Sequence, residues 1–162
     1  MKASGKVFKY GDNVDTDVII PARYLNSFDG KELATHAMVD IDPEFAGKVQ
    51  PGDMIVARKN FGCGSSREQA PEIIKALGIQ CVIAKSFARI FFRNSINNGL
   101  LLIEQPTLYD DIKEGDTISV VMNEHVDYNG KTYPIAALPE NLMDIIRAGG
   151  LVKAMRKLNG LD

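Results

Sequence analysis

Three short apolar runs in the middle of the chain dominate its hydrophobic pattern. Met54–Ala57, Cys81–Ala84 and Leu100–Ile103 contain no charged or strongly polar residue, which is typical of strands buried on both faces. Between them lie two stretches of helical composition, Glu68–Leu77 and Phe87–Asn97, each followed by a glycine within two residues. This β-α-β-α-β order predicts a sheet that is at least partly parallel, with right-handed crossovers.

Shorter runs on either side of this middle segment predict a second, antiparallel group of strands. The dipeptide Asn129-Gly130 is typical of a two-residue hairpin turn and joins two of these runs. Near the end of the chain, two helical stretches are interrupted at Gly149-Gly150. The expected strands are Val7–Tyr10, Val18–Ile20, Thr117–Met122, Val126–Tyr128 and Thr132–Ile135, and the expected C-terminal helices are Leu142–Ala148 and Leu151–Leu158.

Together these elements predict one domain over residues 1–162, of the α/β class, in which a smaller antiparallel layer packs on the parallel core in three layers. The composition, 45% hydrophobic and 25% charged, is that of an ordinary globular protein. A net charge of −2 argues against nucleic acid as the main partner. No apolar run reaches the roughly 18 residues of a membrane span, and the N-terminal residues lack a signal-peptide core, so we expect a cytoplasmic protein.

The cysteines and histidines are too few for a metal cluster. An iron–sulfur cluster needs about four ligands, and the chain has two cysteines, Cys63 and Cys81, which do not form a CxxC pair. The two histidines, His36 and His125, show no zinc-ligand spacing. We therefore expect no metal site in this chain, and we interpret both cysteines as small hydrophobic residues.

The stretch NFGCGSSREQAP, residues 60–71, raises the main question about function. Its plainest interpretation is a turn before a helix, in which Ser65 and Glu68 form a capping box. Pro71 conflicts with this interpretation, because it would remove a backbone hydrogen bond inside the helix, unless the helix is kinked or begins later. From the local pattern alone, a capped turn and a functional loop are equally supported.

Among functional sites, an anion-binding loop fits this stretch best. It lacks the G-x-S-x-G order of a serine-hydrolase elbow and the lysine of a phosphate-binding loop, and no histidine is near Cys63 in sequence to act as its base. Backbone N–H groups of a glycine-rich turn attract anions, and Arg67 offers a planar fork for a carboxylate. Among such donors a hydroxyl of Ser65 or Ser66 is stabilised as an alkoxide and could accept a proton.

Three blocks in a fixed order carry a specific resemblance to a known family. The blocks are DNVDTDVIIPARYL (12–25), the stretch described above, and VIAKSFARIFFRNSINNGLL (82–101). They resemble the small subunits of 3-isopropylmalate dehydratase, in the aconitase superfamily, over most of the chain. The resemblance implies a swivelling β/β/α domain that closes over a separate large subunit carrying a [4Fe-4S] cluster. The implied reaction converts 2-isopropylmalate to 3-isopropylmalate through an alkene in leucine biosynthesis, with iron as Lewis acid.

The resemblance also implies roles for single residues. Ser65 would take the proton from the carbon beside a carboxylate, and Ser66 would help to bind or stabilise the developing charge. Arg67 would hold a substrate carboxylate, unless it forms only a structural salt bridge. Asp17 would orient an arginine or maintain the hydrogen bonds of the site, unless it only makes a turn. Arg23 lies where the family has a second substrate-contacting arginine, with a solvated surface arginine as the alternative.

The segment Tyr24–Gly30 resembles the substrate-selecting loop of the family. Relatives that act on homoaconitate-type substrates can use an arginine there for an extra carboxylate, whereas this chain has Leu25 and Asn26. The lack of charge favours an isopropyl group, although Asn26 is not apolar, so homoaconitase and citraconate or methylmalate hydratase activities stay open. Gln69 stands where many relatives have histidine, and glutamine cannot titrate near neutral pH.

The third block contains Lys85, Ser86 and Arg89, which we interpret as supporting charge and as a helix N-cap at Ser86. Two other classes of function compete with a catalytic subunit: a non-catalytic module that binds an acidic ligand, and RNA binding, which the slightly acidic composition disfavours. Half a site cannot carry out the implied reaction, so the expected partners are a large subunit with the cluster and a small dicarboxylate substrate, without nucleic acid or membrane.

Overall fold

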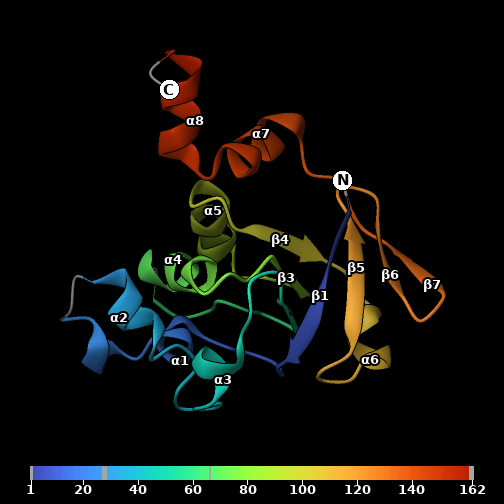
Figure 1. Ribbon diagram of the computed structural model, residues 1–162, viewed down its shortest axis with the longest axis horizontal. Helices are drawn as coiled ribbons and strands as arrows, with labels where there is room; N and C mark the ends of the chain where they lie inside the picture. Colours follow the sequence, from blue (N-terminus) through green and yellow to red (C-terminus); the bar gives the residue numbers. More distant parts are fainter. Residues whose placement is uncertain (1, 27–28, 66, 161–162) are drawn as a thin grey trace.

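The computed structural model describes residues 2–26, 29–65 and 67–160, and a seven-stranded mixed sheet runs through it (Figure 1). The strand order is β4-β3-β2-β1-β5-β6-β7, with β1 to β4 parallel and β5 to β7 antiparallel. The strands are β1 (Lys2–Lys9), β2 (Met54–Ala57), β3 (Cys81–Ala84), β4 (Leu101–Glu104), β5 (Thr117–Val121), β6 (His125–Tyr128) and β7 (Lys131–Pro134).

Helices cover one face of the parallel strands and extend the fold beyond the sheet. In Figure 1, α4 and α5 lie beside the parallel strands, and α8 projects from the body at the top. The helices are α1 (Thr16–Ile19), the 3-10 turn η1 (Ala22–Tyr24), α2 (Gly30–Ala34), α3 (Phe45–Lys48), α4 (Gln69–Ala76), α5 (Arg89–Asn97), α6 (Leu108–Asp111), α7 (Glu140–Ala148) and α8 (Leu151–Leu158). None of those in the described ranges combines the length and apolar character that crossing a membrane requires.

Strand β1 joins the two halves of the sheet. Its first part, residues 2–6, pairs with β5, and its second part, residues 7–9, pairs with β2. The two halves face each other, because alternate residues of the parallel strands belong to different cores. Ile55 and Val82 pack with helical residues such as Phe45, whereas Val56 packs with residues of the antiparallel strands such as Val120. This arrangement of helices, parallel strands and antiparallel strands confirms the predicted three-layered α/β class.

Most local predictions for the sheet are confirmed. Strands β2 and β3 have the predicted bounds, and β4 begins one residue later than predicted. The hairpin turn between β6 and β7 is formed at Asn129-Gly130, with φ of 49° and 79°. The break between the last two helices is at Gly149, whose φ of 93° ends α7 in the left-handed conformation.

The prediction of a strand at Val18–Ile20 is wrong. The segment forms the helical turn α1 and its C-cap at Ile20. Asp15 is the cause, because its Oδ1 accepts a 2.7 Å hydrogen bond from the N–H of Val18 and caps the turn. This local capping outweighs the preference of Val and Ile for strands.

The prediction of Ser86 as a helix N-cap is also wrong. Helix α5 begins at Arg89, and its N-cap is Ala88, which makes no side-chain capping bond. The Oγ of Ser86 accepts a 2.8 Å hydrogen bond from the N–H of Asn60 instead. Ser86 therefore ties the loop after β3 to the loop after β2.

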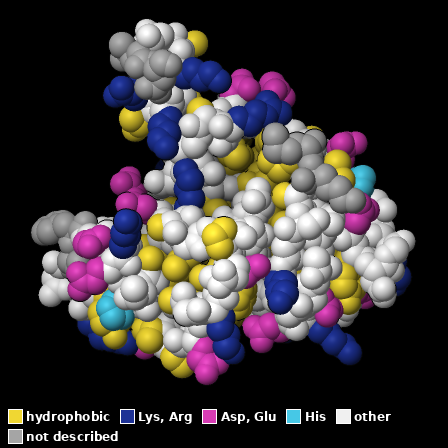
Figure 2. Space-filling view, viewed as in Figure 1, with side chains coloured by type: hydrophobic (Ala, Val, Ile, Leu, Met, Phe, Trp, Pro, Cys, Tyr) yellow, Lys and Arg dark blue, Asp and Glu magenta, His cyan; other side chains and the backbone are white. Residues whose placement is uncertain are grey.

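The last helix is the least buried part of the chain. No residue of α8 is buried, and Val152 and Leu158 are 75% and 80% exposed. Figure 2 shows Lys and Arg side chains gathered around the top of the molecule, where α7 and α8 lie. Helix α8 packs next to the helices α5 and α7.

We expect Gly5→Ala to destabilise the protein. A Cβ on Gly5 would lie 1.9 Å from the carbonyl oxygen of Gly52, so the turn before β2 would have to move away from β1. Overpacking of this kind costs about 1–3 kcal/mol, which lowers Tm by roughly 2–12 °C for a chain of this length. Thermal unfolding followed by circular dichroism measures the change. Gly11→Ala is the control, because a Cβ there meets nothing within 4 Å; equal Tm values for the two variants would contradict the prediction.

Candidate active site

The glycine loop lies at the carboxyl ends of the parallel strands, where loops after β1, β2 and β3 meet. On one side, Phe61 donates its N–H to the carbonyl of Ser86 at 3.1 Å and accepts the N–H of Ala88 at 3.0 Å. On the other side, Gly62 donates to the carbonyl of Val14 at 2.7 Å. The loop is therefore fixed by backbone hydrogen bonds from both neighbouring segments.

Thr16 positions the backbone of Ser65. Its N–H donates to the carbonyl of Cys63 at 2.8 Å, and its Oγ1 donates to the carbonyl of Ser65 at 2.6 Å. Thr16 is 2% exposed, whereas Ser65 is exposed. Thr16 has no role predicted from sequence, although it stands between Asp15 and Asp17. Only its partners in space reveal that it holds the loop.

Two glycines give the loop its shape. Gly62 and Gly64 have φ of 83° and 90°, in the region that favours glycine. A Cβ on Gly62 would also lie 2.1 Å from the ring of Phe91. Among the described residues, no backbone partner takes the N–H groups of Gly64 and Ser65. The turn thus presents free donors of the kind that bind anions.

The helix after the loop begins later than a capping box requires. Its first residue is Gln69 and its N-cap is Glu68, which makes no side-chain capping bond. Pro71 then lies in the first turn, where the missing N–H costs no hydrogen bond. The later start removes the conflict over Pro71 and leaves Ser65 in the loop, not at a helix cap.

The loop forms one wall of a cavity of about 210 Å³. Ser65 and Arg67 line it together with residues at the start of α5. The remaining lining residues are Thr16, Gly62, Gly64, Ala88, Arg89, Ile90, Phe91 and Asn94. Arg89, which the sequence pattern suggested to be only a supporting charge, therefore lines the cavity as well.

Arg67 and Asp17 form an ion pair beside this cavity. The Nη1 of Arg67 donates to Asp17 Oδ1 at 2.9 Å and to the carbonyl of Ile20 at 3.2 Å. The same Oδ1 accepts the N–H of Ala22 at 3.1 Å. The bonds from Arg67 and from Ala22 lower the pKa of the Asp17 carboxyl. Nε and Nη2 of Arg67 donate to no described residue, so Asp17 orients the guanidinium and leaves donors available for a second carboxylate.

The other predicted substrate-binding residues lie away from this cavity. Arg23 makes two hydrogen bonds to the carboxylate of Asp40, one of them 3.1 Å long, and lies 4.8 Å from the ring centre of Tyr24. Leu25 is half-buried against the helical core, and Asn26 is exposed. None of Arg23, Leu25 and Asn26 lines the cavity. Ser66 lies outside the described residues, as do residues 27 and 28 of the Tyr24–Gly30 segment.

The cysteines do not fit a nucleophile or an iron–sulfur cluster. Burial and the charge of Asp15 raise the pKa of Cys63, and burial raises the pKa of Cys81 to about 12. Both thiols are therefore protonated at neutral pH. Within the three described ranges, no group of three or more His, Cys, Asp or Glu side chains could hold a metal ion.

The chain is similar to proteins of one family. Residues 23–108 match the family model described as the aconitase C-terminal domain. A protein named 3-isopropylmalate dehydratase small subunit, from Lachnospira eligens, is 66% identical over 161 residues, covering 99% of this chain and 98% of that protein. One of the same name from Clostridioides difficile is 56% identical over 163 residues, covering 99% and 100%. A crystal structure described as 3-isopropylmalate dehydratase from Methanocaldococcus jannaschii superposes with a TM-score of 0.92 at 48% identity, covering 98% of this chain and 96% of that one.

Proposed function

Since the chain belongs to the family of 3-isopropylmalate dehydratase small subunits, we propose that it interconverts 2-isopropylmalate and 3-isopropylmalate together with a large subunit, in leucine biosynthesis. Its relatives are named as subunits of a hydro-lyase, so the chain is one part of an enzyme with more than one chain. The observation that carries the proposed chemistry is the cavity in which Ser65 and Arg67 lie together.

Arg67 holds one substrate carboxylate in this proposal. Its Nη1 is fixed by Asp17 and Ile20, which aims the rest of the guanidinium fork. A fork of two parallel N–H donors matches a carboxylate in geometry and charge. Arg67 is only 20% exposed on its side chain, so water competes less for these bonds than at an open surface.

Ser65 is the base of the reaction. Its alkoxide takes the proton from the carbon beside the held carboxylate, and the electron pair of that C–H bond becomes the second bond of an alkene. The hydroxyl on the neighbouring carbon leaves with its bonding electrons as hydroxide, which the iron of the large subunit would accept as Lewis acid. The loop N–H groups that have no described backbone partner and the charge of Arg67, which lines the same cavity, are proposed to favour the alkoxide by stabilising negative charge. Return of the proton from Ser65 and of hydroxide, at exchanged carbons, gives the isomer and restores the alkoxide. Ser66, which lies outside the described residues, is proposed to help bind this charge.

The iron–sulfur cluster belongs to the large subunit in this proposal. The two cysteines of this chain do not fit its ligand set, because a cluster needs about four ligands, usually thiolates. Arg23, Leu25 and Asn26 stay predicted substrate contacts, to be reached when the two subunits close. The single domain over residues 1–162 and the cytoplasmic location stay predictions from the sequence.

The test is to mix the chain with a cluster-loaded large subunit and to follow alkene absorbance. 2-Isopropylmalate, a citraconate-type substrate and a homoaconitate-type substrate are compared, with the chain alone as control. Turnover that needs both chains and is best with isopropylmalate supports the proposal. Preference for a tricarboxylate would support the proposed mechanism but contradict the proposed specificity for isopropylmalate. An intact complex without turnover on any of them leaves the loop as a non-catalytic anion-binding turn.

A further inference from the structure

Two arginines line the cavity. Arg67 lies on the loop, and Arg89 is the first residue of α5. A substrate with two carboxylates needs two cationic partners if both charges are to lose water. Arg23, the third arginine in the three sequence blocks that has a predicted role, does not line this cavity.

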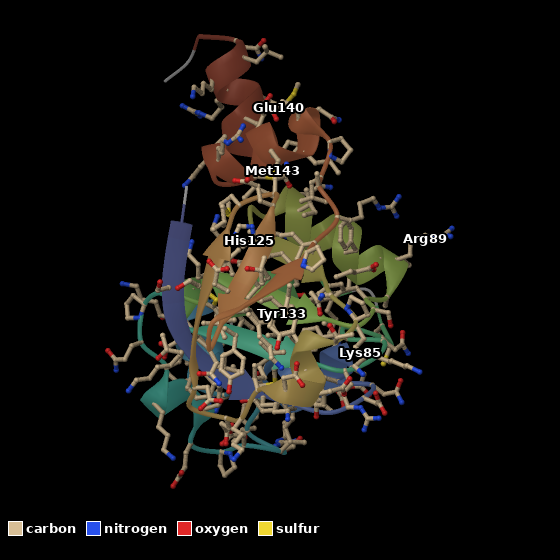
Figure 3. The ribbon with its side chains drawn as sticks, turned by 90° about the vertical axis from the view of Figure 1, so that its right-hand side faces the viewer. Lys85, Arg89, His125, Tyr133, Glu140 and Met143 are labelled. Atoms are coloured by element: carbon tan, nitrogen blue, oxygen red, sulfur yellow. The ribbon has the colours of Figure 1, made fainter. Side chains whose placement is uncertain are left out.

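The three arginines differ in the hydrogen bonds that their guanidinium groups already make within the chain. Arg23 is engaged with Asp40 through two hydrogen bonds, and Arg67 with Asp17 through one. Arg89 makes no hydrogen bond or ion pair with any residue in the described part of the chain, and it is exposed. In Figure 3 its side chain extends away from the ribbon into open space. Asp40 occupies both Nη atoms of Arg23, whereas no described residue occupies the donors of Arg89.

The start of α5 adds to the attraction of Arg89 for an anion. The N-cap Ala88 supplies no side-chain acceptor, so it leaves the first N–H groups of this nine-residue helix without a cap from its own side chain. The helix dipole places partial positive charge at the same end. Ile90, 46% exposed, follows Arg89 and lines the same cavity. This turn therefore offers a cation and an apolar surface side by side, which matches a carboxylate next to a branched alkyl group.

We propose that Arg89 binds the second carboxylate of the substrate, the one that Arg67 does not hold. The inference rests on the proposed function, since it assigns a further substrate-binding residue in the same site. Ser65 lines the same cavity as Arg67 and Arg89, so the base and both proposed carboxylate partners belong to one site. The pair makes the site selective for dicarboxylates over monocarboxylates.

The experiment measures competitive inhibition of the assembled enzyme by 2-isopropylsuccinate, a dicarboxylate without the hydroxyl, and by its two monoamides. The variants are Arg89→Ala, Arg89→Lys and the control Arg93→Ala. Arg93 is an exposed arginine one turn later on α5 that does not line the cavity. Arg89→Ala should raise the Ki of the dicarboxylate on the order of 10- to 100-fold, and it should change the Ki of one monoamide less than about threefold. Arg89→Lys should recover part of the loss, and Arg93→Ala should match the wild type.

Three results would overturn the inference. Equal Ki values in Arg89→Ala and Arg93→Ala would show that Arg89 does not touch the substrate. Equal weakening of the dicarboxylate and of both monoamides would show an indirect effect. Loss of the large subunit in gel filtration would assign Arg89 to the subunit interface. If the wild-type enzyme has no isopropylmalate turnover, the proposed function fails separately, and calorimetric titration of the same complexes with 2-isopropylsuccinate then decides the role of Arg89.

Discussion

Ser65→Ala is expected to lower kcat with 2-isopropylmalate by about 10²- to 10⁴-fold, the range that removal of a general base produces. The complex with the large subunit should still form. Ser65 is exposed, and its Oγ makes no hydrogen bond with any described residue, so its loss leaves no buried group unpaired. The free energy of unfolding should therefore change by less than about 0.5 kcal/mol. Turnover, gel filtration with the large subunit and thermal unfolding measure the three quantities.

The control for this variant is Cys63→Ala, two residues earlier in the same loop. Because the thiol of Cys63 is held protonated by burial and by Asp15, its removal should change kcat by less than about threefold. A second readout is deuterium incorporation into the substrate in D₂O, which cannot occur without proton abstraction and which Ser65→Ala should lose. A Ser65→Ala enzyme that exchanges deuterium at the wild-type rate would show that another group is the base. A large loss in Cys63→Ala would revive the thiol as a candidate.

The buried middle of the chain could be predicted well from sequence. Strands β2 and β3 are buried along their whole length, so every residue had to be apolar and the runs ended where burial ended. Strand β1 could not be bounded in this way. It begins at Lys2, and its first residues pair with β5 while Ser4 and Lys6 are exposed. The pairing depends on a strand more than 100 residues later in the chain, which local pattern does not contain.

The site was predicted in part for the same reason. The residues that a motif carries, Ser65 and Arg67, do line one cavity with each other. Thr16 and Arg89 were not predicted as part of the site, because their relevance comes from their positions in space. Thr16 donates a hydrogen bond to the Ser65 carbonyl, and Arg89 begins the helix that lines the same cavity. Ser86 was assigned to a cap because its neighbours in sequence suggested one, whereas its partner is Asn60 on another loop. Hydrogen bonds between loops that are distant in sequence cannot be predicted from the local sequence pattern.

Arg67→Lys is expected to lower kcat/KM by about 10- to 100-fold, mostly through a higher KM. Lysine keeps the positive charge but loses the planar fork, so it cannot hold Asp17 and a substrate carboxylate with separate, fixed donors. The ion pair with Asp17, whose side chain is 62% exposed, is weakened by the surrounding water, so Tm should fall only slightly. Steady-state kinetics of the assembled enzyme and thermal unfolding measure both. Arg58→Lys is the control, because Arg58 also pairs with an aspartate, Asp12, but does not line the cavity. A lower Tm with an unchanged KM would assign Arg67 to a structural salt bridge and remove it from substrate binding.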